Sequence, residues 1–221
     1  MTKRIPLKMR SLPSYSRGEE IMNMVTHIVG GALGILVLVL GLLRCNSASA
    51  VVGISIYGGS MILLYAVSSV YHGLAPNMGK KVMQVIDHCT IYMLIAGTYT
   101  PIMLVAFVPV YPAIGWGMLA AQWVLAALAA TLTAIDLRKY RAFSMVCYIL
   151  MGWGIIIFLP QAMTVLGSQG FFWLLTGGIT YTVGAVLYGV GSRLPWFHSI
   201  FHIFVVLGSF GQFLAIYGYV L

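Results

Sequence analysis

The chain has 221 residues, of which 61% are hydrophobic and only 7% are charged. Soluble domains usually carry about a quarter charged residues, and a soluble surface with this composition would expose large apolar patches. The composition therefore excludes an ordinary soluble fold and predicts an integral membrane protein.

Residues 1–20 are basic and polar and contain no short apolar core followed by small residues. We therefore expect no cleavable signal peptide, and the first apolar run is expected to serve as an uncleaved signal. The rest of the chain, residues 21–221, is predicted to be one all-α transmembrane domain, a bundle of seven helices. A span needs roughly 20 mostly apolar residues. Seven runs qualify: about Ile21 to Leu43, Ala48 to Tyr71, Val82 to Phe107, Ala113 to Ala134, Ala142 to Leu159, Phe171 to Val190, and His198 to Tyr219.

The cations are distributed unevenly over the predicted loops. Eleven of the twelve Lys and Arg residues lie on one side of a seven-span arrangement, and only Arg44 lies on the other. Because Lys and Arg are retained in the cytoplasm, we predict a cytoplasmic N-terminus and an external C-terminus, in a bacterial inner membrane. The same placement, in short loops beside apolar runs, argues against nucleic acid as a partner despite the net charge of +8.

Several residues within the runs have structural interpretations. Adjacent small residues such as Gly58 and Gly59 allow membrane helices to approach closely, and Pro101 is predicted to kink the third run. The three cysteines are far apart and odd in number, so we interpret them as small apolar residues rather than as a disulfide or metal set. They are Cys45, Cys89 and Cys147.

Ionisable side chains inside membrane spans are costly and therefore informative. Every histidine falls in the predicted cytoplasmic half: His27, His72, His88, His198 and His202. The spacing of His198 and His202 places both imidazoles on one helix face, one turn apart. Ser68 and His72 share a face of the second span in the same way.

Three imidazoles with one open position form a known catalytic zinc set. His72, His198 and His202 are predicted to bind Zn²⁺. Asp87 has a comparable depth and is expected beside these ligands, where its carboxylate balances the ion's charge and positions water. His88 points about 100° away from Asp87 around the helix, so it is not counted as a ligand.

Glu20, Asn23 and His27 form a single stripe on the first span. His27 is either a fourth ligand or part of a polar network with the other two, and the stripe favours the network because it supplies the partners. Asp136 lies at the end of the fourth run beside Arg138 and is interpreted as a solvated loop residue.

The chain resembles the hemolysin III branch of the progestin and adipoQ receptor family, over essentially its whole length. The matching segments are Glu20 to His27, Ser68 to His72, Asp87 to Tyr92 with Ala96 to Pro101, and His198 to His202. The resemblance implies zinc held by His72, His198 and His202, with Asp87 beside the metal. It also places Ser68 in the same site, so Asp87 and Ser68 are the expected catalytic residues, and it places Glu20, Asn23 and His27 in a neighbouring motif. More distantly, the chain is similar to membrane ceramidases, which have the same Ser, Asp and three-His set.

These residues are compatible with more than one function. The first is a zinc-dependent hydrolase of a membrane lipid amide or ester. The second is a non-enzymatic sensor or homeostasis protein, in which zinc only joins two spans. A pore-forming haemolysin is disfavoured because no soluble form is evident, and a metal transporter because the outer half has almost no polar groups. A retinal protein is excluded because no lysine follows Lys139.

Overall fold

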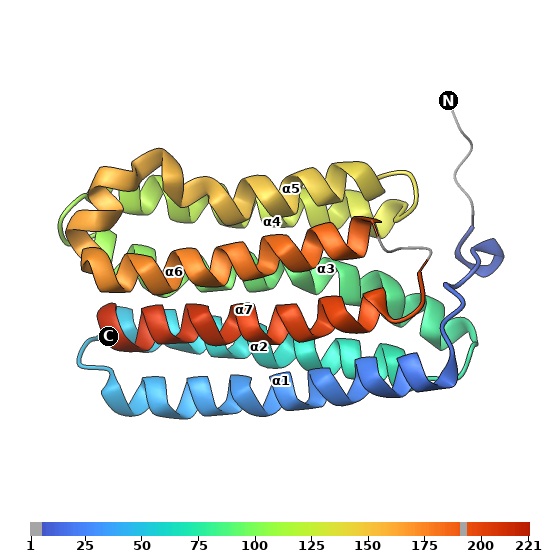
Figure 1. Cartoon of the computed structure of the whole chain (residues 1–221). Coiled ribbons are helices and arrows are strands. Elements are labelled where there is room, and N and C mark those ends of the chain that lie inside the picture. Colours follow the sequence, from blue (N-terminus) through green and yellow to red (C-terminus); the bar gives the residue numbers. More distant parts are fainter. Residues whose placement is uncertain (1–5, 191–193) are drawn as a thin grey trace.

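The computed structural model describes residues 6–190 and 194–221, which form helices and connecting turns with no β-strand in those ranges. The helices run lengthwise in one bundle (Figure 1). They are α1 (Arg17–Arg44), α2 (Ala48–Gly73), α3 (Met78–Pro101), α4 (Pro112–Ile135), α5 (Arg141–Trp153), α6 (Leu159–Val190) and α7 (Phe197–Tyr219), with short helices η1 (Leu7–Met9), η2 (Ile102–Phe107) and η3 (Gly154–Phe158).

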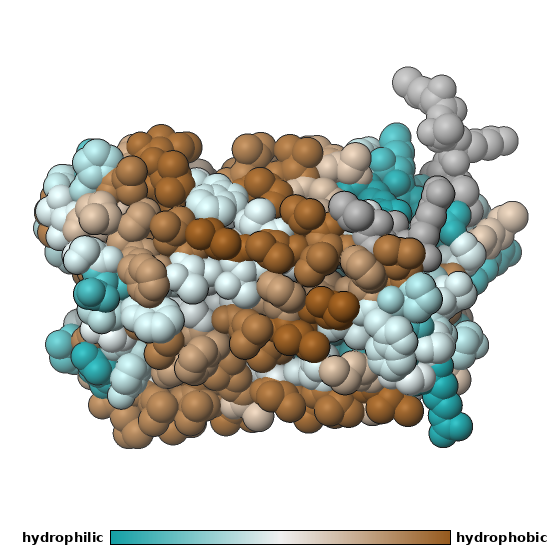
Figure 2. Space-filling view, viewed as in Figure 1, coloured by the Kyte–Doolittle hydropathy of each residue, from teal (hydrophilic) through white to brown (hydrophobic). Residues whose placement is uncertain are grey.

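Six helical segments of the described chain are long and apolar enough to cross a membrane. The longest, Arg141–Gly189, has 49 residues and contains α5, η3 and α6. Its backbone is not helical at Gly167, where φ is 66°, and Figure 1 shows the chain reversing so that the rest of α6 returns alongside α5. Apolar side chains cover much of the length of the bundle, and hydrophilic ones gather towards its ends (Figure 2). The predicted all-α membrane class is confirmed.

Side-chain caps explain where the first helices begin. The Ser16 hydroxyl accepts a hydrogen bond from the Glu19 backbone N–H, while the Glu19 carboxylate accepts one from the Ser16 N–H, which is a complete capping box. Ser47 and Asn77 cap α2 and α3 through the backbone N–H groups of Ala50 and Lys80. These caps stabilise the starts of α1, α2 and α3 within a few residues of the predicted boundaries.

The third predicted run is irregular at its proline, as expected. α3 ends at Pro101, and the chain continues as the π-helical turn η2 instead of a simple kink. Proline lacks the N–H that would continue the α-helical ladder, which accounts for the change in hydrogen bonding. The Pro101 backbone also lies close to Gly53 of α2, where a Cβ atom would stand only 2.7 Å from the Pro101 Cα.

The N-terminal segment packs against the end of the bundle. The Arg10 guanidinium donates to the Ile135 carbonyl at 3.1 Å, and the Lys81 ammonium donates to the Lys8 carbonyl at 2.6 Å. The Arg138 guanidinium donates to the Ser11 hydroxyl. Residues far apart in sequence therefore hold this segment across one end of the helices.

The interpretation of Asp136 made from the sequence is wrong. It is only 6% exposed, so it is not a solvated loop residue. Its carboxylate accepts the backbone N–H groups of Arg138 and Lys139, both at 3.1 Å, and lies 3.9 Å from the Arg10 guanidinium. The burial comes from the N-terminal segment, which a local reading of the α4–α5 loop does not include.

Three cations counted in the predicted topology lie outside the described residues: Lys3, Arg4 and Arg193.

Candidate metal centre

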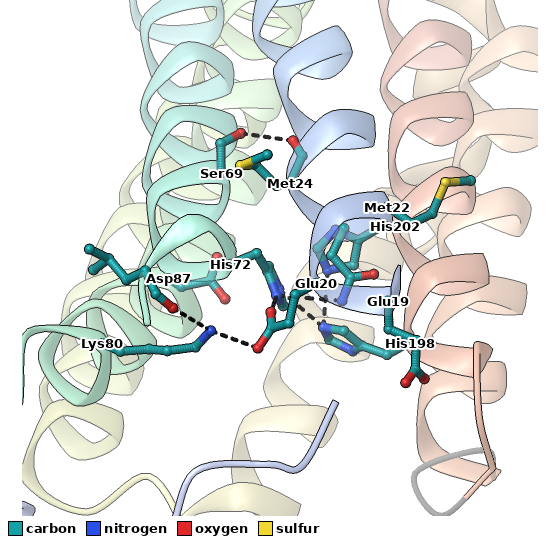
Figure 3. Close-up of polar contacts among 12 residues, drawn as sticks. Glu19, Glu20, Met22, Met24, Ser69, His72, Lys80, Asp87, His198 and His202 are labelled. Carbon is teal, nitrogen blue, oxygen red and sulfur yellow. Dashed lines mark hydrogen bonds and ion pairs between the residues drawn. The ribbon is translucent and has the colours of Figure 1, made fainter. Parts of the chain in front are cut away.

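Three imidazoles from two helices meet near the end of the bundle that carries the N-terminal segment (Figure 3). His72 is at the end of α2, and His198 and His202 are one turn apart at the start of α7. The His72 Nε2 atom lies 3.4 Å from that of His198, which lies 3.0 Å from that of His202. The predicted trio is thus brought together, with its ligand atoms within 4.8 Å of one another.

The start of α7 is fixed by α1. Trp196 has a left-handed backbone with φ of 66°, and its N–H donates to the Glu19 carboxylate at 2.7 Å. Because the same carboxylate caps α1, one acidic side chain holds the first turns of both helices. This contact positions His198, two residues further on, at the centre of the cluster.

Glu20 orients the ring of His72 from the opposite side. The His72 Nδ1–H donates to the Glu20 carboxylate at 2.6 Å, and the Asn23 amide lies 3.4 Å from the same nitrogen. With its proton on Nδ1, the ring directs the bare Nε2 lone pair towards the other two histidines. The second Glu20 oxygen accepts from the Lys80 ammonium at 2.6 Å, which also donates to the Leu74 carbonyl (Figure 3).

The geometry of the trio fits a metal ion. A tetrahedral site with metal–nitrogen bonds of about 2.0–2.1 Å, as in zinc sites, places its nitrogens about 3.3 Å apart. Two of the three Nε2 separations, 3.0 and 3.4 Å, bracket that value, and all three ligand atoms lie within 4.8 Å of one another. Carboxylate contact with the rear nitrogen of a ligand histidine is also the usual arrangement in metal proteins. The cluster can therefore hold a metal ion, with Glu20 behind His72.

His27 lies in a different position from the rest of its stripe. Its ring stacks on His202, with centroids 3.8 Å apart, and meets the Tyr65 ring edge-on. Neither ring nitrogen has a hydrogen-bond partner among the described residues. The three residues of the stripe therefore do not form one network. Glu20 and Asn23 contact His72, whereas His27 packs against the face of His202.

His88 is not part of the converging trio, although it lines the same cavity as His198 and His202. Its Nδ1–H donates to the Gln84 carbonyl at 2.8 Å, and the same nitrogen lies 3.7 Å from the Asp87 carboxylate. The side chains of Asp87 and Ser68 lie within hydrogen-bonding reach of each other. The structure thus places the two residues predicted to act in catalysis together.

Asp87 and Ser68 also line a largely apolar cavity of about 220 Å³, together with His198 and His202. The cavity is enclosed mainly by α3, α5, α6 and α7, with apolar side chains such as Ile149 and Leu175 in its walls. Polar groups at one end of a long apolar cavity suit a ligand that is itself mostly hydrocarbon.

Tyr15 covers the cluster from the N-terminal segment. Its ring stacks on His198 with centroids 4.8 Å apart and an interplanar angle of 13°. Burial raises the pKa of the Tyr15 phenol well above its usual range, so the hydroxyl stays protonated and neutral.

Sequence reasoning missed Tyr15, Lys80 and the role of Glu19. Lys80 was counted only as a loop cation, but it is 3% exposed and pairs with Glu20. The available signal for Glu19 was its position three residues after Ser16, which is the spacing of a capping box. No comparable local pattern marks Tyr15.

Comparison with known proteins gives consistent matches. Residues 15–213 match the family model described as "Haemolysin-III related". The chain is 39% identical to Hemolysin-3 of Bacillus cereus, over 92% of both chains. It is 36% identical to a Hemolysin-3 homolog of Bacillus subtilis (strain 168), over 91% of this chain and 94% of that one. It is 26% identical to the human monocyte to macrophage differentiation factor, over 74% and 68% of the respective chains.

Proposed function

The chain belongs to the haemolysin-III-related membrane proteins of the progestin and adipoQ receptor family, and from this premise we propose that it is a zinc-dependent hydrolase of a membrane lipid amide or ester. One observation carries the proposal: three imidazoles converge, and two of them, those of His198 and His202, line an apolar cavity that Asp87 and Ser68 also line. A metal site with an adjacent carboxylate and an apolar cavity is the combination that lipid hydrolysis needs.

The proposal includes the placement of the site in the membrane. We take the chain to cross seven times, with the N-terminus in the cytoplasm, in a bacterial inner membrane. The reversal at Gly167 supports seven crossings, because it divides the 49-residue segment into two antiparallel passes. The cation distribution supports the orientation. The metal centre then faces the cytoplasmic leaflet, from which a lipid would enter.

When bound by His72, His198 and His202, zinc would polarise the scissile carbonyl and acidify water. Asp87 would accept the proton that water loses as it attacks the carbonyl carbon, and return that proton to the departing amine or alcohol. Ser68 would hold the Asp87 carboxylate in place through its hydroxyl. Glu20 and Lys80 would keep His72 in its ligand orientation, and the apolar walls would hold the acyl chain and exclude bulk water.

A sensor or homeostasis protein is the second candidate. It is favoured by the way the ligands link α2 to α7 and by the Tyr15 ring stacked on His198, since both would suit a structural ion. In that case the same three histidines bind zinc and no lipid is turned over.

The test is metal analysis of the purified protein, followed by incubation with a panel of membrane lipids and mass spectrometry of the products. We expect about one zinc per chain and loss of most of it in His72→Ala, His198→Ala or His202→Ala, because two imidazoles bind far more weakly than three. The double variant of His198 and His202 retains one imidazole and should lose still more. His88→Ala is the matched control and should retain the metal. Zinc-dependent release of a fatty acid supports the hydrolase, and bound zinc without any product supports the sensor. Stoichiometric zinc in the double variant would contradict the ligand assignment.

A further inference from the structure

The apolar cavity meets a cationic groove at one end. Arg141 and Tyr188 line both the cavity and an outer groove to which Arg138 and Lys139 also belong. Arg141 is the first residue of α5, and Tyr188 is near the end of α6. These two side chains, which we call the cationic rim, therefore stand between the interior of the bundle and its polar end.

The positive charge at the rim is not neutralised within the described part of the chain. The whole chain has only four acidic residues, and each one contacts other groups. Glu19 holds Ser16 and Trp196, Glu20 holds His72 and Lys80, Asp87 lies beside Ser68 and His88, and Asp136 binds backbone N–H groups and lies near Arg10. Among the described residues, no carboxylate pairs with the side chain of Arg138, Lys139 or Arg141. The groove therefore attracts anions.

The cationic rim is directly connected to the metal centre. The Arg141 guanidinium carbon lies 5.7 Å from the centroid of the Tyr188 ring, and that ring lies 5.6 Å from the ring of His198. Tyr188 thus lies between Arg141 and His198, which places the rim and the three histidines at the same end of the cavity. From the rim, the cavity follows α5 and η3 as far as Ile156, a distance of about 20 Å at the rise of a helix.

We infer that the cationic rim binds the anionic headgroup, a carboxylate or a phosphate, of a membrane lipid whose acyl chain lies in the apolar cavity. The inference rests on the proposed function and narrows its substrate to anionic lipid amides and esters. In such a substrate the negative charge lies on the headgroup, at the same end of the lipid as the scissile carbonyl.

The chemistry of arginine supports this selectivity. A guanidinium donates paired hydrogen bonds to carboxylate and phosphate oxygens, and such charge-assisted bonds are about twice as strong as neutral ones. A neutral alcohol of the same size offers no charge to the rim. The acyl chain contributes equally in both cases, so the headgroup alone sets the preference.

Binding of two matched lipids to the full-length protein in neutral detergent tests the inference. N-palmitoylglycine and N-palmitoylethanolamine share the acyl chain and the amide and differ in a carboxylate against a hydroxyl. We expect the wild type to bind the anionic amide about tenfold more tightly, and Arg141→Gln to remove most of that difference, as for loss of one charge-assisted hydrogen bond. Arg17→Gln is the control, because Arg17 is an exposed cation of the same end that lines neither the cavity nor the groove.

A second pair, 1-palmitoylglycerol 3-phosphate and 1-palmitoylglycerol, separates phosphate from carboxylate recognition. A preference for the anion in either pair that depends on Arg141 supports the inference. Equal binding of both members of both pairs, no binding of either anion, or an unchanged preference in Arg141→Gln overturns it. The assay needs no turnover, so its failure is distinguishable from failure of the hydrolase proposal. Hydrolysis of neutral lipids alone would support the hydrolase proposal and would contradict the inference that the cationic rim binds an anionic headgroup.

Discussion

At the scale of single residues, substitution of Asp87 distinguishes a catalytic metal site from a structural one. Asp87 is the carboxylate that lies beside Ser68 and lines the cavity, and Asp87→Asn keeps its shape while removing its basicity. If Asp87 acts as the base, the variant should still bind zinc when zinc is plentiful and should lose about 10²–10⁴-fold in the rate of lipid hydrolysis. The measurement is turnover of the lipid that the panel identifies, made on protein with verified metal content.

Ser68→Ala is the companion variant and should lose less activity, because the hydroxyl only assists through a hydrogen bond. Removing a group that merely supports ligands weakens metal binding by about 10–100-fold, which excess zinc offsets. Full activity in zinc-loaded Asp87→Asn would therefore remove the proposed base.

The residues of the centre differ in how far sequence could predict them. His198 and His202 were predictable from the helical period, and the predicted topology placed His72 and Asp87 at a similar depth. The contacts of Tyr15 and Lys80 depend on how separate segments pack, which no local spacing encodes. Asp136 was misread for the same reason: the carboxylate is buried by a segment more than a hundred residues earlier in the chain.

At the scale of helices, close packing of α2 against α3 depends on a missing side chain. A Cβ at Gly53 would stand 2.7 Å from the Pro101 Cα, which is backbone and cannot rotate away. We predict that Gly53→Ala lowers stability by about 1–3 kcal/mol, as overpacking usually does. Thermal unfolding in detergent measures the change.

Gly59→Ala, in the same helix, is the control. A Cβ at Gly59 meets nothing within 4 Å, so the change should be neutral or stabilising by up to about 1 kcal/mol through helix propensity. Equal effects of the two substitutions would show that α2 and α3 do not pack as described.

The predicted runs match most of the observed helices and differ from them at the fifth and sixth runs. Apolar length alone located α1 to α4 and α7, since long periodic runs have few alternatives in a membrane. The fifth and sixth runs are different, because α6 begins at Leu159 and includes the turn at Gly167. The predicted loop between Leu159 and Phe171 contains Gly167, so hydropathy located the reversal, but it did not show that the chain is already helical from Leu159 up to that turn.

At the scale of the whole molecule, the proposed orientation makes a prediction about the termini. Seven crossings with a cytoplasmic N-terminus place Leu221 outside and the α4–α5 loop inside. A reporter enzyme that works only outside the cytoplasm should be active when fused after Leu221 and inactive when inserted at Lys139. A cytoplasmic C-terminus would mean an even number of crossings, and the 49-residue segment would then need to be reconsidered.

The arrangement of the metal centre also has a consequence for biosynthesis. His72 and His198 are 126 residues apart, and the ends of α1 and α7 are held together by Glu19. During translation, α2 enters the membrane while most of the chain, including the remaining two ligands, has not yet been made. The site is therefore completed only when the last helix leaves the translocon and docks against the first two. Under the proposed function, zinc binds only after this step, so a nascent chain stalled before α7 lacks two of the three proposed ligands.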